Sequence, residues 1–311
     1  MARFLITGGA GFIGSHLHER LRASGHAVRV LDDLSTGHRA NLPADADLVV
    51  ADCADPAAVH AAAAGMDGIF HLAAIASVQR GNEDWLGTHR ANQTATITVL
   101  DAARARRLPV VYASSAATYG NATERPITEA TPQVPLTAYG ADKLGSELHA
   151  RVAWEVHGVP TAGLRFFNVF GPRQDPASPY SGVISIFASR VAARRPLVLH
   201  GDGRQSRDFI YVADVVAHLV AAMALLARAP QCALANVCRG EAVSVGELAA
   251  TLARLSGWAA PEIGHGEARA GDIRHSLGSP AHATALLGVA ATTGLEEGLR
   301  ATLAWLGQAA P

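Results

Sequence analysis

The chain has 311 residues, of which 49% are hydrophobic and 17% are charged, and its formal net charge is −1. A length of this order predicts about two domains, or one large domain with an appended lobe. A nearly neutral chain lacks the excess of positive charge that binds nucleic-acid phosphates. No uncharged apolar run reaches the ~18 residues of a membrane-spanning helix. We therefore expect neither a nucleic-acid nor a membrane partner.

The chain has three cysteines, Cys53, Cys232 and Cys238, and they form no Cys-x-x-Cys pair. The odd count argues against a disulfide framework and fits a reducing cytoplasm. The N-terminus enters a strand pattern at once, so we expect no signal peptide. We also expect no metal site.

Short apolar runs alternate with helical patterns over the first ~165 residues, which predicts a parallel sheet covered on both faces. The expected strands are Phe4–Thr7, Val28–Leu31, Leu48–Ala51, Gly68–Leu72, Val110–Ser114 and Ala162–Phe166. The expected helices are Ile13–Ala23, Ala57–Ala64, Thr88–Arg107 and Ala141–His157. This order of elements predicts an α/β fold with a Rossmann-type, doubly wound parallel sheet.

The pattern changes after Asn168, where prolines and a glycine interrupt it as in a long ordered loop. Helices are expected at Ile184–Ala193 and Asp214–Leu226, and two further helical patterns flank a Gly-rich, charged loop in Val243–Gln308. We therefore predict a dinucleotide-binding domain and a smaller, partly interleaved α/β substrate lobe. The first covers residues 1–168, with 209–238 returning to it, and the second covers 169–208 and 239–311.

A glycine-rich turn, TGGAGFIG over residues 7–14, follows the first predicted strand. Gly9, Gly11 and Gly14 fit the dinucleotide fingerprint, and Gly8, Gly11 and Gly14 fit the spacing used by short-chain dehydrogenases. Such glycines let the backbone approach a pyrophosphate at the positive end of the next helix, although they also end strands for purely steric reasons. Asp32, 18 residues after Gly14, favours the first interpretation. A carboxylate there bonds ribose hydroxyls and repels the extra phosphate of NADP, so NAD is the expected cofactor.

Tyr139 and Lys143 are four residues apart in a helical pattern and share one face. Lys143 is the single lysine among 26 basic residues. Its compact ammonium can lower the pKa of a phenol and bond a ribose, whereas the fork of arginine is bulkier and its charge is delocalised. Ser114 and Ser115 end a predicted strand, at the edge where open α/β sheets bind ligands. A serine hydroxyl there could steady a carbonyl or alkoxide beside the tyrosine, with turn capping as the alternative.

Six motifs follow one another in the order of a known family. They are TGGAGFIG from Thr7, DDLSTG from Asp32, HLAA from His71, SSAATYG from Ser114, Tyr139-x-x-x-Lys143 and RDFIYV from Arg207. The match continues through LRFFNVFGPRQDP from Leu164 and RAGDIRHS from Arg269. Over nearly its whole length the sequence resembles the extended short-chain dehydrogenase/reductases, most closely the UDP-galactose 4-epimerase group.

The resemblance implies a role for each matching position. Ser115, Tyr139 and Lys143 are implied as the catalytic residues, while His71 is expected to be a packed strand-end residue. The implied NAD contacts are Gly8, Gly11, Phe12, Ile13, Gly14, Asp32, Asp33, Ser35, Thr36, Gly37, Asp52, Cys53, Leu72, Ala73, Ala74, Asn92, Tyr139, Lys143 and Phe166. The implied contacts to the UDP-sugar are Ser114, Ser115, Asn168, Arg207, Arg269, Asp272 and Ser276.

The implied reaction is epimerisation at carbon 4 of a UDP-hexose through a transient 4-keto sugar. The small Ser276 extends the expected substrates to the N-acetylated pair. A UDP-glucuronate 4-epimerase or a 4-ketosugar reductase stays open within the family. A non-catalytic NAD(H) sensor stays open in another class, although the complete Ser–Tyr–Lys set argues against it.

Dehydration is disfavoured because Ala116 and Ala117 stand where sugar dehydratases carry an acidic pair. The glutamate that decarboxylating relatives use near this position is also absent. The family further implies a homodimer that pairs the helices at Thr88–Arg107 and Ala141–His157.

Overall fold

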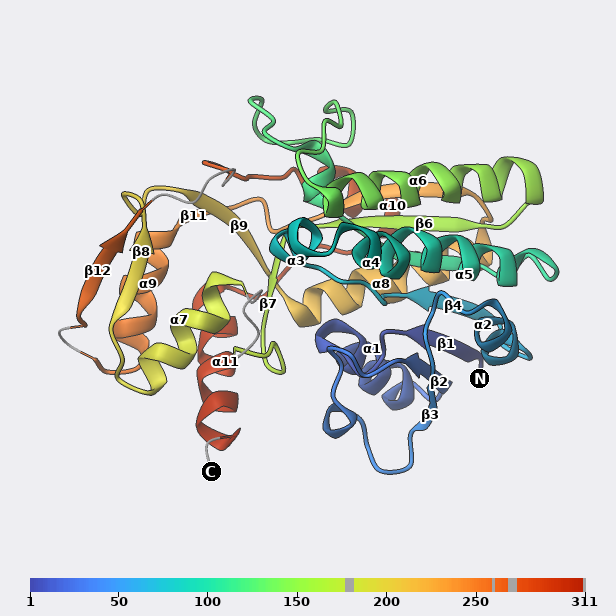
Figure 1. The fold of residues 1–311 in the computed structure, drawn as a ribbon, viewed down its shortest axis with the longest axis horizontal. Coiled ribbons are helices and arrows are strands. Elements are labelled where there is room, and N and C mark those ends of the chain that lie inside the picture. Colours follow the sequence, from blue (N-terminus) through green and yellow to red (C-terminus); the bar gives the residue numbers. More distant parts are fainter. Residues whose placement is uncertain (177–181, 259–260, 268–272, 310–311) are drawn as a thin grey trace.

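The computed structural model describes residues 1–176, 182–258, 261–267 and 273–309, which form a larger and a smaller lobe (Figure 1). The larger lobe is built on a seven-stranded sheet of order β10-β6-β5-β4-β1-β2-β3, in which every pairing is parallel. The strands are β1 Arg3–Thr7, β2 Ala27–Asp32, β3 Asp47–Val50, β4 Gly68–His71, β5 Val110–Ser115, β6 Thr161–Phe166 and β10 Cys232–Val237. The predicted α/β fold with a parallel sheet is confirmed.

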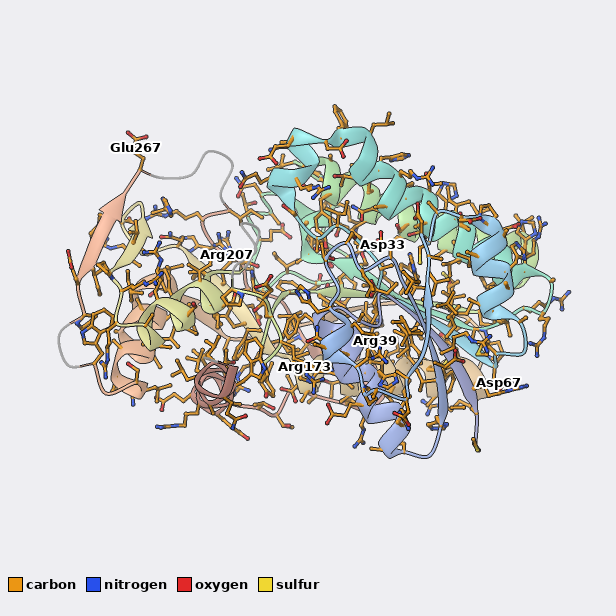
Figure 2. All side chains as sticks on the ribbon, turned by 60° about the horizontal axis from the view of Figure 1, so that its bottom comes forward. Asp33, Arg39, Asp67, Arg173, Arg207 and Glu267 are labelled. Atoms are coloured by element: carbon orange, nitrogen blue, oxygen red, sulfur yellow. The ribbon has the colours of Figure 1, made fainter. Side chains whose placement is uncertain are left out.

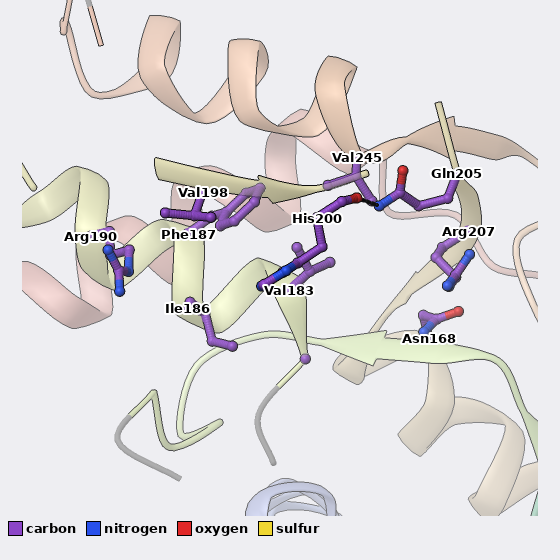
Figure 3. A pocket seen from close by; sticks show the side chains of 11 residues that line it. Asn168, Val183, Ile186, Phe187, Arg190, Val198, His200, Gln205, Arg207 and Val245 are labelled. Carbon is purple, nitrogen blue, oxygen red and sulfur yellow. Dashed lines mark hydrogen bonds between the residues drawn. The ribbon is translucent and has the colours of Figure 1, made fainter. Parts of the chain in front are cut away.

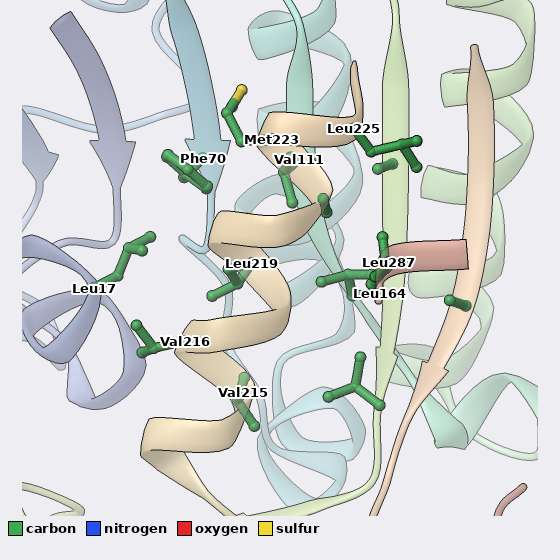
Figure 4. Packing of buried hydrophobic residues seen from close by; sticks show 14 of the residues in the cluster. Leu17, Phe70, Val111, Leu164, Val215, Val216, Leu219, Met223, Leu225 and Leu287 are labelled. Atoms are coloured by element: carbon green, nitrogen blue, oxygen red, sulfur yellow. The ribbon is translucent and has the colours of Figure 1, made fainter. Parts of the chain in front are cut away.

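Helices cover both faces of this sheet, because its central strands are apolar on both sides. One face carries α1 Phe12–Ala23, α8 Val212–Arg228 and α10 Ala281–Leu287. Figure 4 shows α8 packing Val216, Leu219 and Met223 between the sheet and α1. The other face carries α2 Pro56–Ala63, α3 Val78–Glu83, α4 Trp85–His89, α5 Ala95–Arg104 and α6 Ala138–His157.

The helix expected over Thr88–Arg107 is present as far as Arg104, but it contains a π-helical turn that was not predicted. A π-helical turn at Arg90–Thr94 separates α4 from α5. Within it, Asn92 accepts a hydrogen bond from the Ile75 amide (2.8 Å) and donates one to the Ile75 carbonyl (3.3 Å). A π turn is wider than an α turn and is frequent at functional sites. We attribute the π turn to this tertiary contact, which the helical period of the sequence does not reveal.

In its described residues, the smaller lobe has two small sheets and three helices. The three-stranded sheet has the order β11-β9-β7, from Ala242–Ser244, Ser206–Tyr211 and Asn168–Phe170, and a parallel pair joins β8 Leu197–His200 to β12 Ile263–Gly266. Its helices are α7 Val183–Ala192, α9 Val245–Leu255 and α11 Leu295–Ala309. Among the described residues after 243, the structure has the helices α9, α10 and α11 where two helical patterns were expected, because α10 spans only seven residues and is too short to show a period.

Two short 3₁₀ turns complete the elements, η1 Arg39–Asn41 and η3 Ala116–Tyr119. The three cysteines are free, and only Cys232 is exposed. Within the described residues, no helix is both long and apolar enough to cross a membrane. Among the same residues, no group of three or more His, Cys, Asp or Glu side chains is arranged to hold a metal ion.

Candidate active site

The three predicted catalytic residues meet where β5 ends and α6 begins. Thr137 starts α6 by accepting a hydrogen bond from the Gly140 amide (3.1 Å), which directs Tyr139 and Lys143 toward β5. The Lys143 ammonium donates to the Ala113 carbonyl (2.8 Å) and lies 5.8 Å from the centre of the Tyr139 ring. The Ser115 side chain lies close enough to the Tyr139 phenol to lower its pKa. A serine, a phenol and a buried ammonium therefore share one site.

The electrostatics of this site depart from one expectation. Burial raises the pKa of Tyr139, and the hydrogen bond from Ser115 offsets only part of that rise. Burial lowers the pKa of Lys143 to about 8, against the opposing charges of Asp142 and Glu147. Lys143 was expected to hold the pKa of Tyr139 down, but in the chain alone the net direction is upward. The ammonium faces the ring and a backbone carbonyl. The positive charge of the nicotinamide, with NAD bound, would further favour a phenolate.

The glycine turn between β1 and α1 is shaped for close approach. Gly8 has φ +70°, and a Cβ on Gly14 would lie 2.2 Å from the Gly8 carbonyl oxygen. Gly11 begins α1 with no side-chain cap, and the first turn of the helix has no acidic residue. Its amides are therefore free of side-chain acceptors and face outward at the positive helix end. These residues fit the pyrophosphate of NAD.

Asp32 lies at the end of β2 with its carboxylate held by backbone amides. It accepts hydrogen bonds from Ala10 and Leu34, both at 2.9 Å, and burial raises its pKa while these bonds lower it. Gly37 packs directly against it, since a Cβ there would lie 2.8 Å from Oδ1. Each oxygen keeps a second lone pair for a ribose hydroxyl. The fit to NAD therefore extends from the glycine turn to this carboxylate.

The other residues implied for the adenosine side lie around Asp32. Asp33 is exposed and accepts from the amide and hydroxyl of Ser35 (2.9 and 2.7 Å), and Thr36 is exposed beside them. Asp52, after β3, pairs with Arg90 (2.9 Å), and the neighbouring Cys53 is buried. Burial raises the pKa of Cys53 to about 12. The Cys53 thiol is therefore protonated at neutral pH.

The segment after β4 borders the same edge of the sheet. Leu72, Ala73 and Ala74 are half-buried there, next to the Asn92 contact. His71 lies beneath them, between the hydroxyls of Thr7 (2.7 Å) and Thr96 (3.1 Å). Burial lowers the pKa of His71 to about 3, so it is a neutral packed residue.

A cavity of about 410 Å³ opens in the smaller lobe beside the end of β6 (Figure 3). Asn168 and Arg207, both predicted substrate residues, line it. Arg190 and His200 add basic groups, and no carboxylate is among the residues that line the cavity. The remaining lining residues are Gly182, Val183, Ile186, Phe187, Val198, Gln205 and Val245. A basic pocket with apolar walls suits an anion that carries a flat ring.

Sequence reasoning missed the part of this pocket formed by Arg190, His200 and Gln205. The helix that carries Arg190 was predicted, but nothing in its pattern reveals which strand it faces. Figure 2 shows Arg207 on the smaller lobe and Asp33 on the larger one. The pocket residues Asn168 and Arg207 thus belong to the smaller lobe, whereas Asp33 and the predicted substrate residues Ser114 and Ser115 belong to the larger one.

The other predicted substrate residues differ in their positions. Ser276 is buried, and its amide donates to the Ser206 carbonyl (3.0 Å), next to Arg207. Ser114 is also buried, but its hydroxyl donates to Glu147 (2.5 Å) on α6. The structure therefore directs Ser114 into the interior, away from Ser115. Arg269 and Asp272 lie outside the described residues.

Comparison with known proteins identifies the family. Residues 4–238 match the model of the NAD dependent epimerase/dehydratase family. A UDP-glucose 4-epimerase of Mycolicibacterium smegmatis is 34% identical over 313 residues, 97% of each chain. The chain therefore belongs to this family, whose members use NAD.

Solved structures agree over almost the full chain. The UDP-glucose 4-epimerase of Thermus thermophilus, in complex with NAD, is 35% identical with a TM-score of 0.90, covering 99% of this chain and 100% of that one. The enzyme of Thermotoga maritima, with UDP-glucose, is 29% identical with a TM-score of 0.93, covering 98% and 99%. Relatives with another activity match as well. A UDP-N-acetyl-alpha-D-glucosaminuronate decarboxylase of Bacillus cytotoxicus is 34% identical over 231 residues, 71% of each chain. The family is thus certain, and the reaction has to be argued from the site.

Proposed function

We propose that this protein is an NAD-dependent 4-epimerase of UDP-hexoses. The observation that carries the proposal is the meeting of Ser115, Tyr139 and the buried Lys143 in one site of a protein whose smaller lobe holds a basic pocket without carboxylates. The larger lobe would bind NAD through the glycine turn and Asp32. The smaller lobe would bind the nucleoside diphosphate, with Arg207 and Arg190 on the phosphates. The UDP-glucose bound to the Thermotoga relative supports this assignment.

Each catalytic residue would have a distinct task. Bound NAD supplies a hydride acceptor and donor for carbon 4 of the sugar. Tyr139, as phenolate, would take the proton of the 4-hydroxyl, and as phenol it would return it. The Ser115 hydroxyl accepts a hydrogen bond from the Ala117 amide (3.1 Å), so its single proton is available to donate. With substrate bound, that proton would turn from Tyr139 to the oxygen at carbon 4. Lys143 would bond the ribose and stabilise the phenolate.

Dehydration fits this site less well. Removing a hydroxyl from the sugar requires an acid to protonate it and a base to take a carbon-bound proton. The two residues that follow Ser115 are Ala116 and Ala117, which can do neither. We therefore infer that the 4-keto sugar at Ser115 does not lose a hydroxyl group and is instead reduced back to an alcohol.

We also propose that the protein forms a homodimer through α4, α5 and α6, which lie side by side on one face of the larger lobe (Figure 1). Along α6, Leu148, Val152 and Val156 are 59%, 51% and 68% exposed and recur every four residues. Trp85 on α4 and Ile97 on α5 are exposed as well. Exposed apolar side chains gathered on neighbouring helices are typical of a protein interface.

Two measurements test the proposed reaction. Purified protein is denatured, and the released NAD(H) is quantified. Native protein is then incubated with UDP-glucose, UDP-galactose, UDP-N-acetylglucosamine and UDP-glucuronate without added cofactor. Interconversion of UDP-glucose and UDP-galactose is expected. Conversion of UDP-glucuronate alone would replace the proposed substrate, and retained NAD without turnover of any sugar would favour the sensor.

A further inference from the structure

The interior of the larger lobe holds an ion pair that the proposed chemistry does not use. Arg165 on β6 is 1% exposed, and Glu147 on α6 is similarly buried. Two parallel hydrogen bonds join them, Nε to Oε1 at 2.8 Å and Nη2 to Oε2 at 2.6 Å. This bidentate geometry fixes the direction of both side chains.

Stability alone gives a poor account of this pair. Desolvating two charges offsets much of their attraction, and apolar replacements of buried pairs are often neutral or stabilising. The value of a buried pair lies more in the geometry that it imposes. We therefore expect the pair to fix the positions of the residues that it contacts.

The ion pair is connected to the segment around Ser115 through two residues, which we call its arms. The first arm is Ser114, the residue before Ser115. The Ser114 hydroxyl donates to Glu147 Oε1, the same oxygen that accepts from Arg165. Ser114 also lies opposite Arg165 in the parallel register of β5 and β6. One turn before Glu147 on α6, Lys143 donates to the carbonyl of Ala113. The final residues of β5 are thus bonded to α6 at two successive positions.

The other arm reaches the turn that follows Ser115. The turn η3 begins after Ser115 and ends at Tyr119, which is 1% exposed. The Tyr119 hydroxyl accepts from Arg165 Nη1 (2.6 Å) and donates to Asn236 Oδ1 (2.7 Å) on β10. The guanidinium also lies 4.7 Å from the centre of the Tyr119 ring. Ser115 is therefore held between two anchored residues, and both anchors bond to the same ion pair.

We propose that Arg165 and Glu147 are positioning residues that hold Ser115 against Tyr139, with Ser114 and Tyr119 as the two arms through which they act. The inference rests on the proposed function, since Ser115 and Tyr139 touch the reacting oxygen in that reaction. It assigns Ser114 to the positioning of its neighbour, in place of the sugar contact that the resemblance implied.

Removing the hydroxyl group of each arm in turn tests the proposal while the ion pair itself stays intact. Ser114→Ala and Tyr119→Phe each remove one hydroxyl, whereas removing either charge would leave its partner buried and unpaired. Tyr112→Phe is the matched control. Tyr112 is a buried tyrosine on the same strand, and its hydroxyl makes no hydrogen bond to the pair or to either arm among the described residues.

Four quantities are measured on the NAD-bound proteins: kcat and KM for UDP-galactose, the pKa of Tyr139 and the urea midpoint of unfolding. The Tyr139 phenolate is titrated by ultraviolet difference absorbance, with the trace of Tyr139→Phe subtracted. We expect kcat to fall about tenfold in each arm variant with KM within about twofold, as for the loss of one buried hydrogen bond that orients a reacting group. The pKa of Tyr139 should rise in both, because its hydrogen bond from Ser115 weakens. The control Tyr112→Phe should leave both kcat and the pKa of Tyr139 unchanged.

A loss of stability with unchanged kcat and an unchanged pKa of Tyr139 in both arm variants would overturn the positioning role. Equal changes in Tyr112→Phe would overturn it too, since they would reflect general loosening. If the parent protein does not convert UDP-galactose, the proposed function fails. The phenolate titration still decides whether the pair holds Ser115 against Tyr139.

Discussion

Replacing Lys143 by methionine should stabilise the NAD-free protein at neutral pH while abolishing turnover of UDP-galactose. Lys143 is 4% exposed, and burial lowers its pKa from 10.5 to about 8. That difference corresponds to roughly 3 kcal/mol against the charged form in the folded protein. The loss of the hydrogen bond to the Ala113 carbonyl destabilises the methionine variant by about 1 kcal/mol. A net gain of about 2 kcal/mol remains, or ~3 °C in Tm for a chain of this length.

The gain has a defined pH dependence. Below pH 8 the ammonium is charged in both the folded and the unfolded state, so the full penalty of burying it is present. Between pH 8 and 10.5 the folded protein releases the proton first, and the penalty disappears. The advantage of Lys143→Met should therefore be complete at pH 7 and small near pH 10.

The assay is thermal unfolding at both pH values, on protein whose NAD content has been checked, together with turnover of UDP-galactose. Lys143→Arg is the comparison variant. It keeps a charge that cannot be released and adds N–H donors, so it should gain no stability and still lose most activity. A destabilised methionine variant, or an equal gain at pH 7 and pH 10, would refute the electrostatic argument. Turnover near that of the parent in the arginine variant would refute a special role for this lysine.

Three further predictions concern the cofactor, the substrate and the assembly. Asp32→Ala should retain less NAD and discriminate less against NADP, because the carboxylate that bonds ribose hydroxyls is gone. Asp32→Asn, which keeps an acceptor for the Ala10 amide, controls for folding, and full NAD retention in the alanine variant would contradict the placement of Asp32. Ser276→Tyr should abolish turnover of UDP-N-acetylgalactosamine while largely sparing UDP-galactose, since steric exclusion discriminates more sharply than the ~1–3 kcal/mol of one methylene contact. An unchanged kcat/KM ratio of the two sugars would remove Ser276 from the pocket. Val152→Glu should give a monomer by light scattering because it places charge on the apolar face of α6, and a persistent dimer would mean that another surface mediates assembly.

Several properties of this protein could be predicted from its sequence because they depend on residues close together in the chain. The strand–glycine turn–helix pattern at residues 3–23 and the helical spacing of Tyr139 and Lys143 are local geometry. The carboxyl ends of parallel strands meet at one edge of a sheet, which is why Asp32 and Ser115 could be expected near the same ligand. The α/β fold follows from the alternation of short apolar strands and helices.

Only the tertiary structure decided the features that join distant residues. The Tyr119–Asn236 hydrogen bond spans 117 positions, and no periodicity relates its two partners. The pocket in the smaller lobe is lined by segments that begin at Asn168, Gly182, Val198 and Val245. Because these segments meet only in the folded protein, the absence of carboxylates from the pocket could not be predicted from the sequence. The π turn at Arg90–Thr94 and the inward direction of Ser114 each depend on one contact, to Ile75 and to Glu147. Such contacts follow from the packing of whole elements against one another, and local patterns carry no record of that packing.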